Sequence, residues 1–389
     1  MRMSLLLNRS SRRAMPCAAA VSHSKNSHSG YRPPLTAGGF TVPCIWRYTM
    51  KFLQLGATAP ALRKLVRRTL LPMALLGTAV ASAAVQANDK LVLLTSWYAQ
   101  AEHGGFYQAV AEDIYAKHGL DVTIRMGGPQ VNGMQLLLSK QADVIVNYDL
   151  QVLKSLEQNL PVVAIAGVFQ GDPQGMLTHP DVTGLDDLKD KKVLVATTGQ
   201  STWWPWLKGK YGLNDAQARP YTFNLQPFFA DTAVVQQAYA SSELFQAKKA
   251  GIDANFYLFA DHGYPPYGST LVTRQDVIDE RPEVLQRFVA ATMEGWKSYL
   301  ANPAPANQLI KQDNPNMNDE VIAWGVDKLK DFKLVTGGDA ATQGIGVMTD
   351  SRWKATRDFM VGAGLLSADV DWKKGYDLRF VGGDAKVLP

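Results

Sequence analysis

The charge of the chain changes abruptly near residue 87. Residues 1–87 contain 12 Lys and Arg and no Asp or Glu. Of the 40 Lys and Arg in the chain, 28 therefore remain for residues 88–389, together with all 35 Asp and Glu. The formal net charge of +5 thus combines a basic leader with an acidic remainder of −7. We expect the folded, working part of the protein to lie in the acidic remainder.

The second half of the leader, about residues 50–87, has the pattern of a secretory signal peptide. Basic residues within 63–68 precede the apolar run 70–84, and small residues at 81–83 and 85–87 suit cleavage. The run is shorter than the roughly 20 residues that a bilayer crossing needs. We expect an exported protein whose signal peptide is cleaved; an uncleaved membrane anchor is the alternative.

Residues 1–49 show no periodic apolar pattern, and Met50 can open a signal peptide by itself. We expect Met50 to be the true initiator, and a transit peptide is the alternative interpretation of residues 1–49. Cys17 and Cys44 both precede Met50, so the exported chain would have no cysteine for a disulfide or a metal site. An exported, cysteine-free, acidic protein is typical of the bacterial periplasm.

Short apolar runs alternate with helical patterns after residue 88. The expected strands are 91–94, 122–124, 143–147, 162–168, 192–196, 221–223, 255–259 and 269–273. The principal expected helices are 106–118, 131–140, 150–158, 201–210, 283–300, 305–312, 319–330 and 352–365. This alternation predicts an α/β fold with βαβ units and mostly parallel strands, with ligands beyond the carboxyl ends of the strands. About 300 residues usually divide into two domains.

The order of several motifs resembles that of the solute-binding proteins similar to thiamine pyrimidine synthase. The motifs are Thr95–Trp97, Glu102–Ala109, Tyr115–Val122, Ala142–Val144, Leu185–Val193 and Tyr264–Gly268. The resemblance covers roughly residues 90–370. Within this group the aromatic-rich pattern is most similar to binders of thiamine pyrimidine precursors, while other relatives bind sulfonates, taurine, nitrate or riboflavin.

The resemblance implies a type II periplasmic-binding-protein fold, in which two α/β lobes are joined by two crossings with a ligand cleft between them. The crossings are expected near 178–183 and 263–269. The first lobe would comprise residues 90–180 plus 268–389, and the second residues 181–267. Closure of the lobes would bury a small molecule, and an ABC permease with its ATPase would recognise the closed form. A monomer that meets the membrane only through this transporter is expected.

Aromatic residues and a helix start mark the expected cleft in the first lobe. Trp97 follows the first strand, where a heteroaromatic ring would stack, although a core tryptophan is an equally good interpretation. His103 would hydrogen-bond a ring nitrogen, and Gly104 would bring the helix N-terminus close to the ligand; a solvent-facing His103 is the alternative. The first-lobe candidates are Trp97, Tyr98, His103, Gly104, Tyr107, Tyr148 and Phe169.

A dense aromatic cluster marks the expected cleft in the second lobe. One tryptophan of 203–206 would stack opposite Trp97, but three tryptophans in four positions cannot all face one side of a helix. Glu243 would accept a hydrogen bond from an exocyclic amine, with an exposed helix position as the alternative. The second-lobe candidates are Ser201, Thr202, Trp203, Trp204 and Glu243.

Motifs that carry catalysis are absent from the sequence, which contains no G-x-S-x-G elbow, P-loop or G-x-G-x-x-G. The four histidines after residue 88 are not paired at i, i+3 or i, i+4, so no metal or cofactor is expected. The acidic charge and the lack of Lys and Arg clusters argue against nucleic acid.

Three functions remain open at this point. The first is a binding protein that delivers a small heteroaromatic, a thiamine pyrimidine precursor, to an ABC importer. The second is a binder of aliphatic sulfonate, taurine or nitrate, which would use helix N-termini and basic residues such as Arg125 or Arg274. The third is an enzyme resembling the eukaryotic thiamine pyrimidine synthases, which is disfavoured because those enzymes carry a cysteine-rich motif and act in the cytosol.

Overall fold

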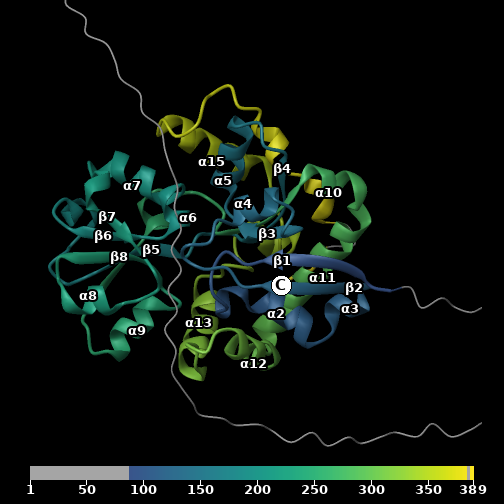
Figure 1. The fold of residues 1–389 in the computed structure, drawn as a ribbon, viewed down its shortest axis with the longest axis horizontal. Coiled ribbons are helices and arrows are strands. Elements are labelled where there is room, and N and C mark those ends of the chain that lie inside the picture. Colours follow the sequence, from purple (N-terminus) through teal and green to yellow (C-terminus); the bar gives the residue numbers. More distant parts are fainter. Residues whose placement is uncertain (1–86, 383–385) are drawn as a thin grey trace, which may run out of the picture. The chain divides into compact units, whose positions relative to one another are not determined.

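The computed structural model describes residues 87–382 and 386–389. The expected initiator and apolar run lie outside the described residues. Among the described residues, no helix is long and apolar enough to cross a membrane. The described strands form two five-stranded sheets that lie side by side in Figure 1 and belong to one compact unit.

The first sheet has the strand order β2-β1-β3-β10-β4. Its strands are β1 (Asp89–Leu94), β2 (Leu120–Arg125), β3 (Val144–Asn147), β4 (Val162–Phe169) and β10 (Ser269–Arg274). Strand β1 pairs in parallel with β2 and β3, whereas β10 runs antiparallel to β3 and β4. All eight residues of β4 are buried, as expected for a strand covered by helices on both faces.

The second sheet has the strand order β7-β6-β8-β5-β9. Its strands are β5 (Gln174–Thr178), β6 (Lys192–Val195), β7 (Ala218–Pro220), β8 (Val234–Tyr239) and β9 (Asn255–Leu258). Strand β6 is parallel to β7 and β8, and β5 is antiparallel to β8 and β9. Each sheet is therefore mixed, because the strand that follows each crossing between the sheets runs against its neighbours.

Helices cover both sheets. Their bounds are α2 (Gly104–Ala111), α3 (Ile114–Lys117), α4 (Gly133–Leu138), α5 (Asp149–Glu157), α6 (Thr197–Gln200), α7 (Trp203–Tyr211), α8 (Gln226–Ala230), α9 (Glu243–Lys249), α10 (Gln275–Glu280), α11 (Pro282–Ala301), α12 (Ala304–Asp313), α13 (Asp319–Asp331), α14 (Ala340–Gln343) and α15 (Asp350–Gly362). The helix expected over 106–118 is divided, because Asp113 takes a left-handed conformation with φ of 55° between α2 and α3.

The two expected α/β lobes are present, but three strands differ from the sequence prediction. Strand β5 was not predicted and belongs to the second sheet, although it falls within the expected first-lobe range 90–180. Strand β8 was not predicted either, and the strand expected at 221–223 ends at Pro220 instead. We therefore propose lobe boundaries in which the first crossing lies between β4 and β5, near residues 170–173.

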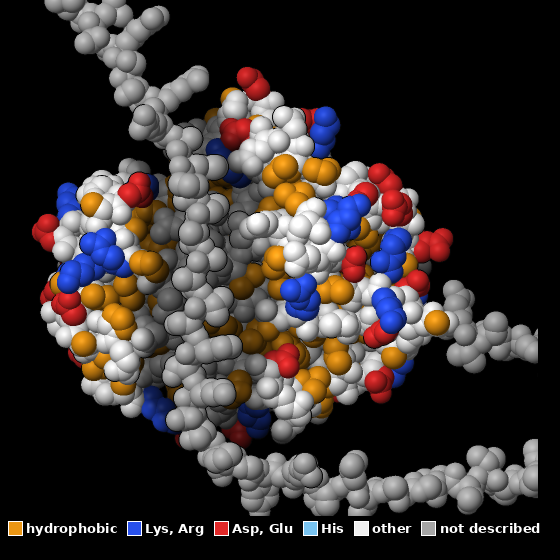
Figure 2. Space-filling view, viewed as in Figure 1, with side chains coloured by type: hydrophobic (Ala, Val, Ile, Leu, Met, Phe, Trp, Pro, Cys, Tyr) orange, Lys and Arg blue, Asp and Glu red, His pale blue; other side chains and the backbone are white. Residues whose placement is uncertain are grey.

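The surface shown in Figure 2 carries both signs of charge interspersed with apolar side chains. On this face of the described residues no large patch of a single sign is visible. Nucleic-acid binding surfaces usually concentrate Lys and Arg on one face.

Helix α11 packs tightly against α2 in the core of the first lobe. A Cβ placed on Gly295 of α11 would lie 2.4 Å from the backbone oxygen of Gly105 and 2.7 Å from Cβ of Ala109. Both distances are too short for carbon in a packed core, so the helices can approach only because residue 295 has no side chain.

Gly295→Ala is expected to lower the free energy of unfolding by about 1–3 kcal/mol, because the new methyl group must push the two helices apart. Gly362→Ala, in α15, is the matched control, since a Cβ there meets nothing within 4 Å. Urea unfolding measures both. Equal stability of the two variants would contradict the close crossing of α2 and α11.

Candidate functional site

A cavity lies between the two lobes, and residues at the strand ends of both sheets contribute to its walls. The space between its lining side chains is about 630 Å³, part of which opens to solvent. Its lining residues are Ser96, Trp97, Gln100, Glu102, His103, Tyr148, Phe169, Gln174, Thr198, Gln237, Ala238, Tyr239, Ser242, Glu243, Gly268 and Ser269.

The carboxyl ends of several strands position these residues. Trp97 follows β1, Tyr148 follows β3, and Phe169 ends β4. From the second sheet, Tyr239 ends β8, and Thr198 lies in α6 after β6. Open α/β sheets bind ligands beyond the carboxyl ends of their strands, so the cavity has the location that the sequence predicts.

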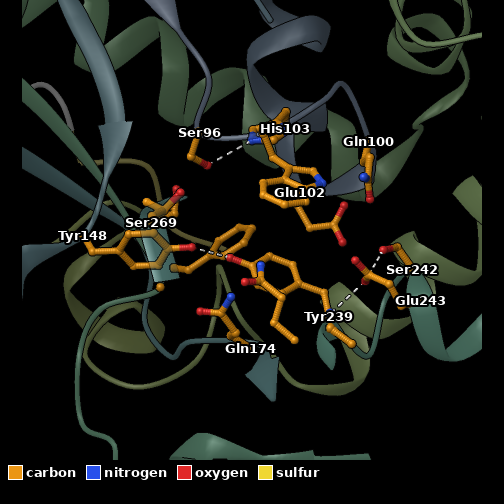
Figure 3. Close-up of a pocket in the computed structure, with 16 residues that line it drawn as sticks. Ser96, Gln100, Glu102, His103, Tyr148, Gln174, Tyr239, Ser242, Glu243 and Ser269 are labelled. Atoms are coloured by element: carbon orange, nitrogen blue, oxygen red, sulfur yellow. Dashed lines mark hydrogen bonds between the residues drawn. The ribbon is translucent and has the colours of Figure 1, made fainter. Parts of the chain in front are cut away.

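Aromatic side chains from both lobes meet in the cavity. The Tyr148 and Tyr239 hydroxyl oxygens lie 2.7 Å apart and join the lobes by a hydrogen bond, drawn in Figure 3. Trp97 is half-buried and stacks on Tyr221 of the second lobe, with ring centroids 5.8 Å apart and planes 17° apart. The ring that faces Trp97 across the lobes is therefore Tyr221, whereas a tryptophan of 203–206 was expected.

Two buried carboxyl groups face the same space in Figure 3, those of Glu102 and Glu243. Glu243 accepts hydrogen bonds from the Tyr221 hydroxyl at 2.8 Å, the Tyr239 N–H at 2.9 Å and the Ser242 hydroxyl at 2.5 Å. Burial raises the pKa of Glu243 above its ordinary value. Three donors already occupy Glu243, which leaves it little capacity for a ligand.

Glu102 has far fewer protein partners than Glu243. Its Oε1 accepts a hydrogen bond from the Ser241 hydroxyl of the second lobe. Burial raises the pKa of Glu102 to about 7, and the nearby Glu243 adds to this effect. Near neutral pH, Glu102 can therefore be either a donor or an acceptor toward a bound molecule.

His103 presents a defined nitrogen to the cavity. Its Nδ1 lies 3.1 Å from the backbone oxygen of Tyr98, which can only accept, so Nδ1 carries the hydrogen. Its Nε2 lies 3.5 Å from the Ser96 hydroxyl oxygen. Burial lowers the pKa of His103 to about 4, so the ring is neutral at pH 7 and Nε2 is an acceptor.

Two further polar groups in the cavity wall have no hydrogen-bond partner within the part of the chain that the structure describes. They are Nε2 of Gln100 and the hydroxyl oxygen of Ser269, both buried. A buried donor without a partner costs about 1–3 kcal/mol, so these groups suit contact with a bound polar molecule. Gln100 lies beside Glu102 in Figure 3.

The structure places three expected first-lobe residues outside the cavity lining. Tyr107 donates its hydroxyl hydrogen to Asp313 at 2.7 Å. A Cβ on Gly104 would lie 2.0 Å from the ring of Tyr299, so this glycine serves helix packing and does not open a space for ligand. Tyr98 packs against Phe223, with ring centroids 5.7 Å apart.

The expected second-lobe cluster lies mainly in the hydrophobic core. Trp203 is fully buried against Phe259, and Trp204 donates its ring N–H to Asp215 at 2.9 Å. Thr202 is buried and donates to the backbone oxygen of Thr198. These three residues do not line the cavity, and Ser201 lines a neighbouring cavity.

Five of the expected residues line the cavity, namely Trp97, His103, Tyr148, Phe169 and Glu243. The residues that sequence reasoning missed include Gln100, Glu102, Gln174, Gln237, Tyr239 and Ser269. Glu102 lies inside a motif already recognised, next to His103, and its position before a helix start was the available signal. Tyr239 was missed because its strand, β8, was missed.

A family model described as "NMT1/THI5 like" matches residues 100–306. The chain is 24% identical to the riboflavin-binding protein RibY of Chloroflexus aurantiacus over 76% of this chain and 87% of that protein. It is also 24% identical to the formylaminopyrimidine-binding protein of Halalkalibacterium halodurans, over 61% of this chain and 74% of that protein.

Solved structures show the same fold. The alkanesulfonate-binding protein SsuA of Xanthomonas axonopodis pv. citri, bound to MOPS, superposes with a TM-score of 0.57 at 11% identity. The match covers 74% of this chain and 98% of that protein. The two α/β lobes are therefore those of the periplasmic-binding-protein fold, as expected from the sequence.

Trp203→Ala is expected to lower the free energy of unfolding by about 3–5 kcal/mol, because it empties a fully buried site. Trp97→Ala is expected to cost less than about 2 kcal/mol, because Trp97 is half-buried. Urea unfolding of both variants compares them directly. A larger loss for Trp97→Ala would contradict the division into core and cavity residues.

Glu102→Gln is expected to change how stability depends on pH. Because the pKa is about 7 in the folded protein and 4.5 ordinarily, ionisation costs the wild type stability as pH rises from 4.5 to 7. The variant should therefore gain up to about 3 kcal/mol over the wild type across this range, and nothing further above it. Thermal unfolding from pH 4 to 8 measures the difference, with the exposed Glu283→Gln as control. A difference that does not grow with pH would contradict the burial of an ionisable Glu102.

Proposed function

The chain belongs to the NMT1/THI5-like family, and from this premise we propose that it is the substrate-binding protein of an ABC importer. The proposed ligand is a small heteroaromatic, with a thiamine pyrimidine precursor as the first candidate. The named relatives are binding proteins, one for riboflavin and one for formylaminopyrimidine, and both ligands are heteroaromatic. The protein would bind and release this ligand without chemistry.

The observation that carries the proposal is the combination of aromatic walls and polar groups in one cavity. Trp97, Tyr148 and Phe169 supply aromatic surface from three strand ends of the first sheet. None of the described residues that line the cavity is Lys or Arg. Offset aromatic pairs gain about 0.5–1.5 kcal/mol beyond burial, so a flat ring is a favoured occupant.

The polar groups of the cavity match the edge of an aminopyrimidine. Nε2 of His103 accepts from an N–H, and Nε2 of Gln100 donates to a ring nitrogen. Glu102 is the better partner for an exocyclic amine than Glu243, which three protein donors already hold. We therefore assign the amine contact to Glu102 and a supporting role to Glu243.

An anionic sulfonate or nitrate fits the cavity less well. Such ligands favour basic side chains or open helix N-termini. The start of α2 at Gly104 is filled by Tyr299, and the cavity contains two carboxyl groups. The similarity to a sulfonate-binding protein is a likeness of fold at 11% identity.

The periplasmic location of the protein rests on the sequence pattern of the leader, which predicts export and cleavage. Partnership with a permease and its ATPase follows from the proposed role. We propose binding in preference to catalysis because no cysteine follows Cys44 and no catalytic motif is present in the sequence.

A thermal-shift panel tests the proposed ligand class. Hydroxymethyl- and formylaminopyrimidines are expected to raise the melting temperature by several degrees, since a ligand at 100 times its Kd adds about 2.7 kcal/mol. Thiamine, riboflavin, taurine, an alkanesulfonate and nitrate complete the panel. If only the sulfonates raise the melting temperature, the protein is still a binding protein, but the proposal that its cavity binds an aromatic ring is wrong.

Trp97→Ala is expected to weaken binding of the best pyrimidine at least about tenfold, which corresponds to about 1.4 kcal/mol. Trp372→Ala is the matched control, because Trp372 is likewise half-buried but does not line the cavity. Titration calorimetry measures both affinities. Unchanged affinity of Trp97→Ala would show that this tryptophan does not contact the ligand.

A further inference from the structure

A second cavity adjoins the first and lies between the same two lobes. Ser96 and Thr198 line both cavities, so the two spaces share a wall from each lobe. The space between its lining side chains is about 440 Å³, part of which opens to solvent. Its first-lobe wall comes from the ends of β1 and β3, the start of α4 and Gln151 of α5. Its second-lobe wall comes from α6 and the residue that follows it.

The lining of the second cavity is polar and uncharged. Hydroxyl groups come from Thr95, Ser96, Thr197, Thr198 and Ser201, and amide groups come from Asn132, Asn147 and Gln151. Val131, Met134 and Val146 supply an apolar part. None of the described residues in this lining carries a charge. The first cavity differs because it contains two carboxyl groups and the aromatic walls.

Asn147 is the group in this cavity that most needs a partner. It ends β3 and is only 3% exposed. Its Nδ2 is buried and makes no hydrogen bond within residues 87–382 and 386–389. A buried amide donor without a partner is unfavourable, so an acceptor on a bound molecule would stabilise the site.

Polar contacts between the lobes enclose this space. Nε2 of Gln151 donates to the Ser201 hydroxyl oxygen at 2.8 Å. The Thr197 N–H donates to the backbone oxygen of Pro129 at 2.9 Å. Both contacts join the first lobe to the second, so lobe closure would bury whatever occupies the second cavity together with the contents of the first.

We propose that the second cavity is a subsite of the same cleft that takes a neutral, hydroxyl-bearing chain or sugar attached to the ring. This inference rests on the proposed function and specifies its substrate class further. Hydroxyl groups both donate and accept, which matches a wall of hydroxyls and amides, and an uncharged chain requires no counter-ion. A carboxylate or phosphate would lack a cation here, and a purely apolar chain would leave Nδ2 of Asn147 unpaired.

Two pairs of probes test the subsite by calorimetric titration, and each pair differs only in the chain on the ring. Riboflavin is compared with lumiflavin, and cytidine with 1-methylcytosine; in each pair a methyl group replaces the hydroxylated part. In whichever pair carries a ring that the first cavity accepts, the hydroxylated compound is expected to bind at least about tenfold more tightly than its methyl analogue. Asn147→Ala is expected to remove most of this advantage, which is the ratio of the two affinities within each pair.

Asn316→Ala, at an exposed position away from both cavities, is the control and should retain the full advantage. If the members of a pair bind with equal affinity, the proposal of a subsite for the hydroxylated chain is wrong, while the proposed ring-binding function stands. An advantage that persists in Asn147→Ala overturns the assignment to this cavity. If no ring compound of either pair or of the pyrimidine panel binds, the proposed function fails and the subsite fails with it.

Discussion

The cleft depends on the close contact between the two crossings that join the sheets. A Cβ on Gly268 would lie 2.6 Å from the backbone oxygen of Gly171 and 2.8 Å from Cα of Asp172. Only glycine allows the second crossing to approach the first so closely. Phe169 and Ser269 end β4 and begin β10 on either side of this contact, and both line the first cavity. The crossings thus fix one wall of the ligand site as well as the connection between the lobes.

Burial also raises the pKa of carboxyl groups beside the crossings, outside the lining of either cavity. Besides Glu102, Asp172 has its pKa raised to about 8 and Asp149 to about 6, in both cases mainly through burial. Asp149 is held by the Thr356 hydroxyl and by the N–H of Tyr267, so its role is structural. Glu102 differs because it lines the cavity and has one side-chain donor, Ser241. A ligand that donates hydrogen bonds would offset the cost of burying this group.

Sequence reasoning predicted strands from short runs of apolar and β-branched residues, and it missed β5 and β8, both of which contain glutamine. Strand β8 reads Val-Val-Gln-Gln-Ala-Tyr, and Gln236 within it is fully buried. Its polar side chain broke the apolar pattern, so both the strand and the cavity residue Tyr239 at its end went unpredicted. The cavity is lined by residues at the ends of correctly predicted strands, such as Trp97, Tyr148 and Phe169. They lie together because the carboxyl ends of these strands meet at the same edge of the first sheet.

The tryptophan cluster shows why residue type alone could not locate the second-lobe wall. Tryptophan is suited both to stacking on a ligand and to filling a core, and the sequence contains no signal that separates the two uses. Packing separates them: Trp203 lies against Phe259 inside the lobe, and Tyr221 takes the position opposite Trp97. Tyr221 also donates to Glu243, so one side chain supports both an aromatic wall and a carboxyl group of the cavity.

The contacts between the lobes fall into two kinds with different consequences for binding. Outside the first cavity, the Trp324 ring N–H donates to the backbone oxygen of Ala240 at 2.8 Å, and Gln151 donates to Ser201 in the wall of the second cavity. Neither contact involves a residue that lines the first cavity, so both can persist with a ring in place. Inside, the Tyr148–Tyr239 and Glu102–Ser241 hydrogen bonds use groups that a ligand would also seek. A ligand that breaks these two inner hydrogen bonds gains only the difference in free energy between its new contacts and the broken ones. A ligand that fits beside them leaves both hydrogen bonds in place, so they continue to stabilise the closed lobes. We therefore expect selectivity for the ring to be set by the inner pairs and lobe closure to be stabilised by the contacts outside the first cavity.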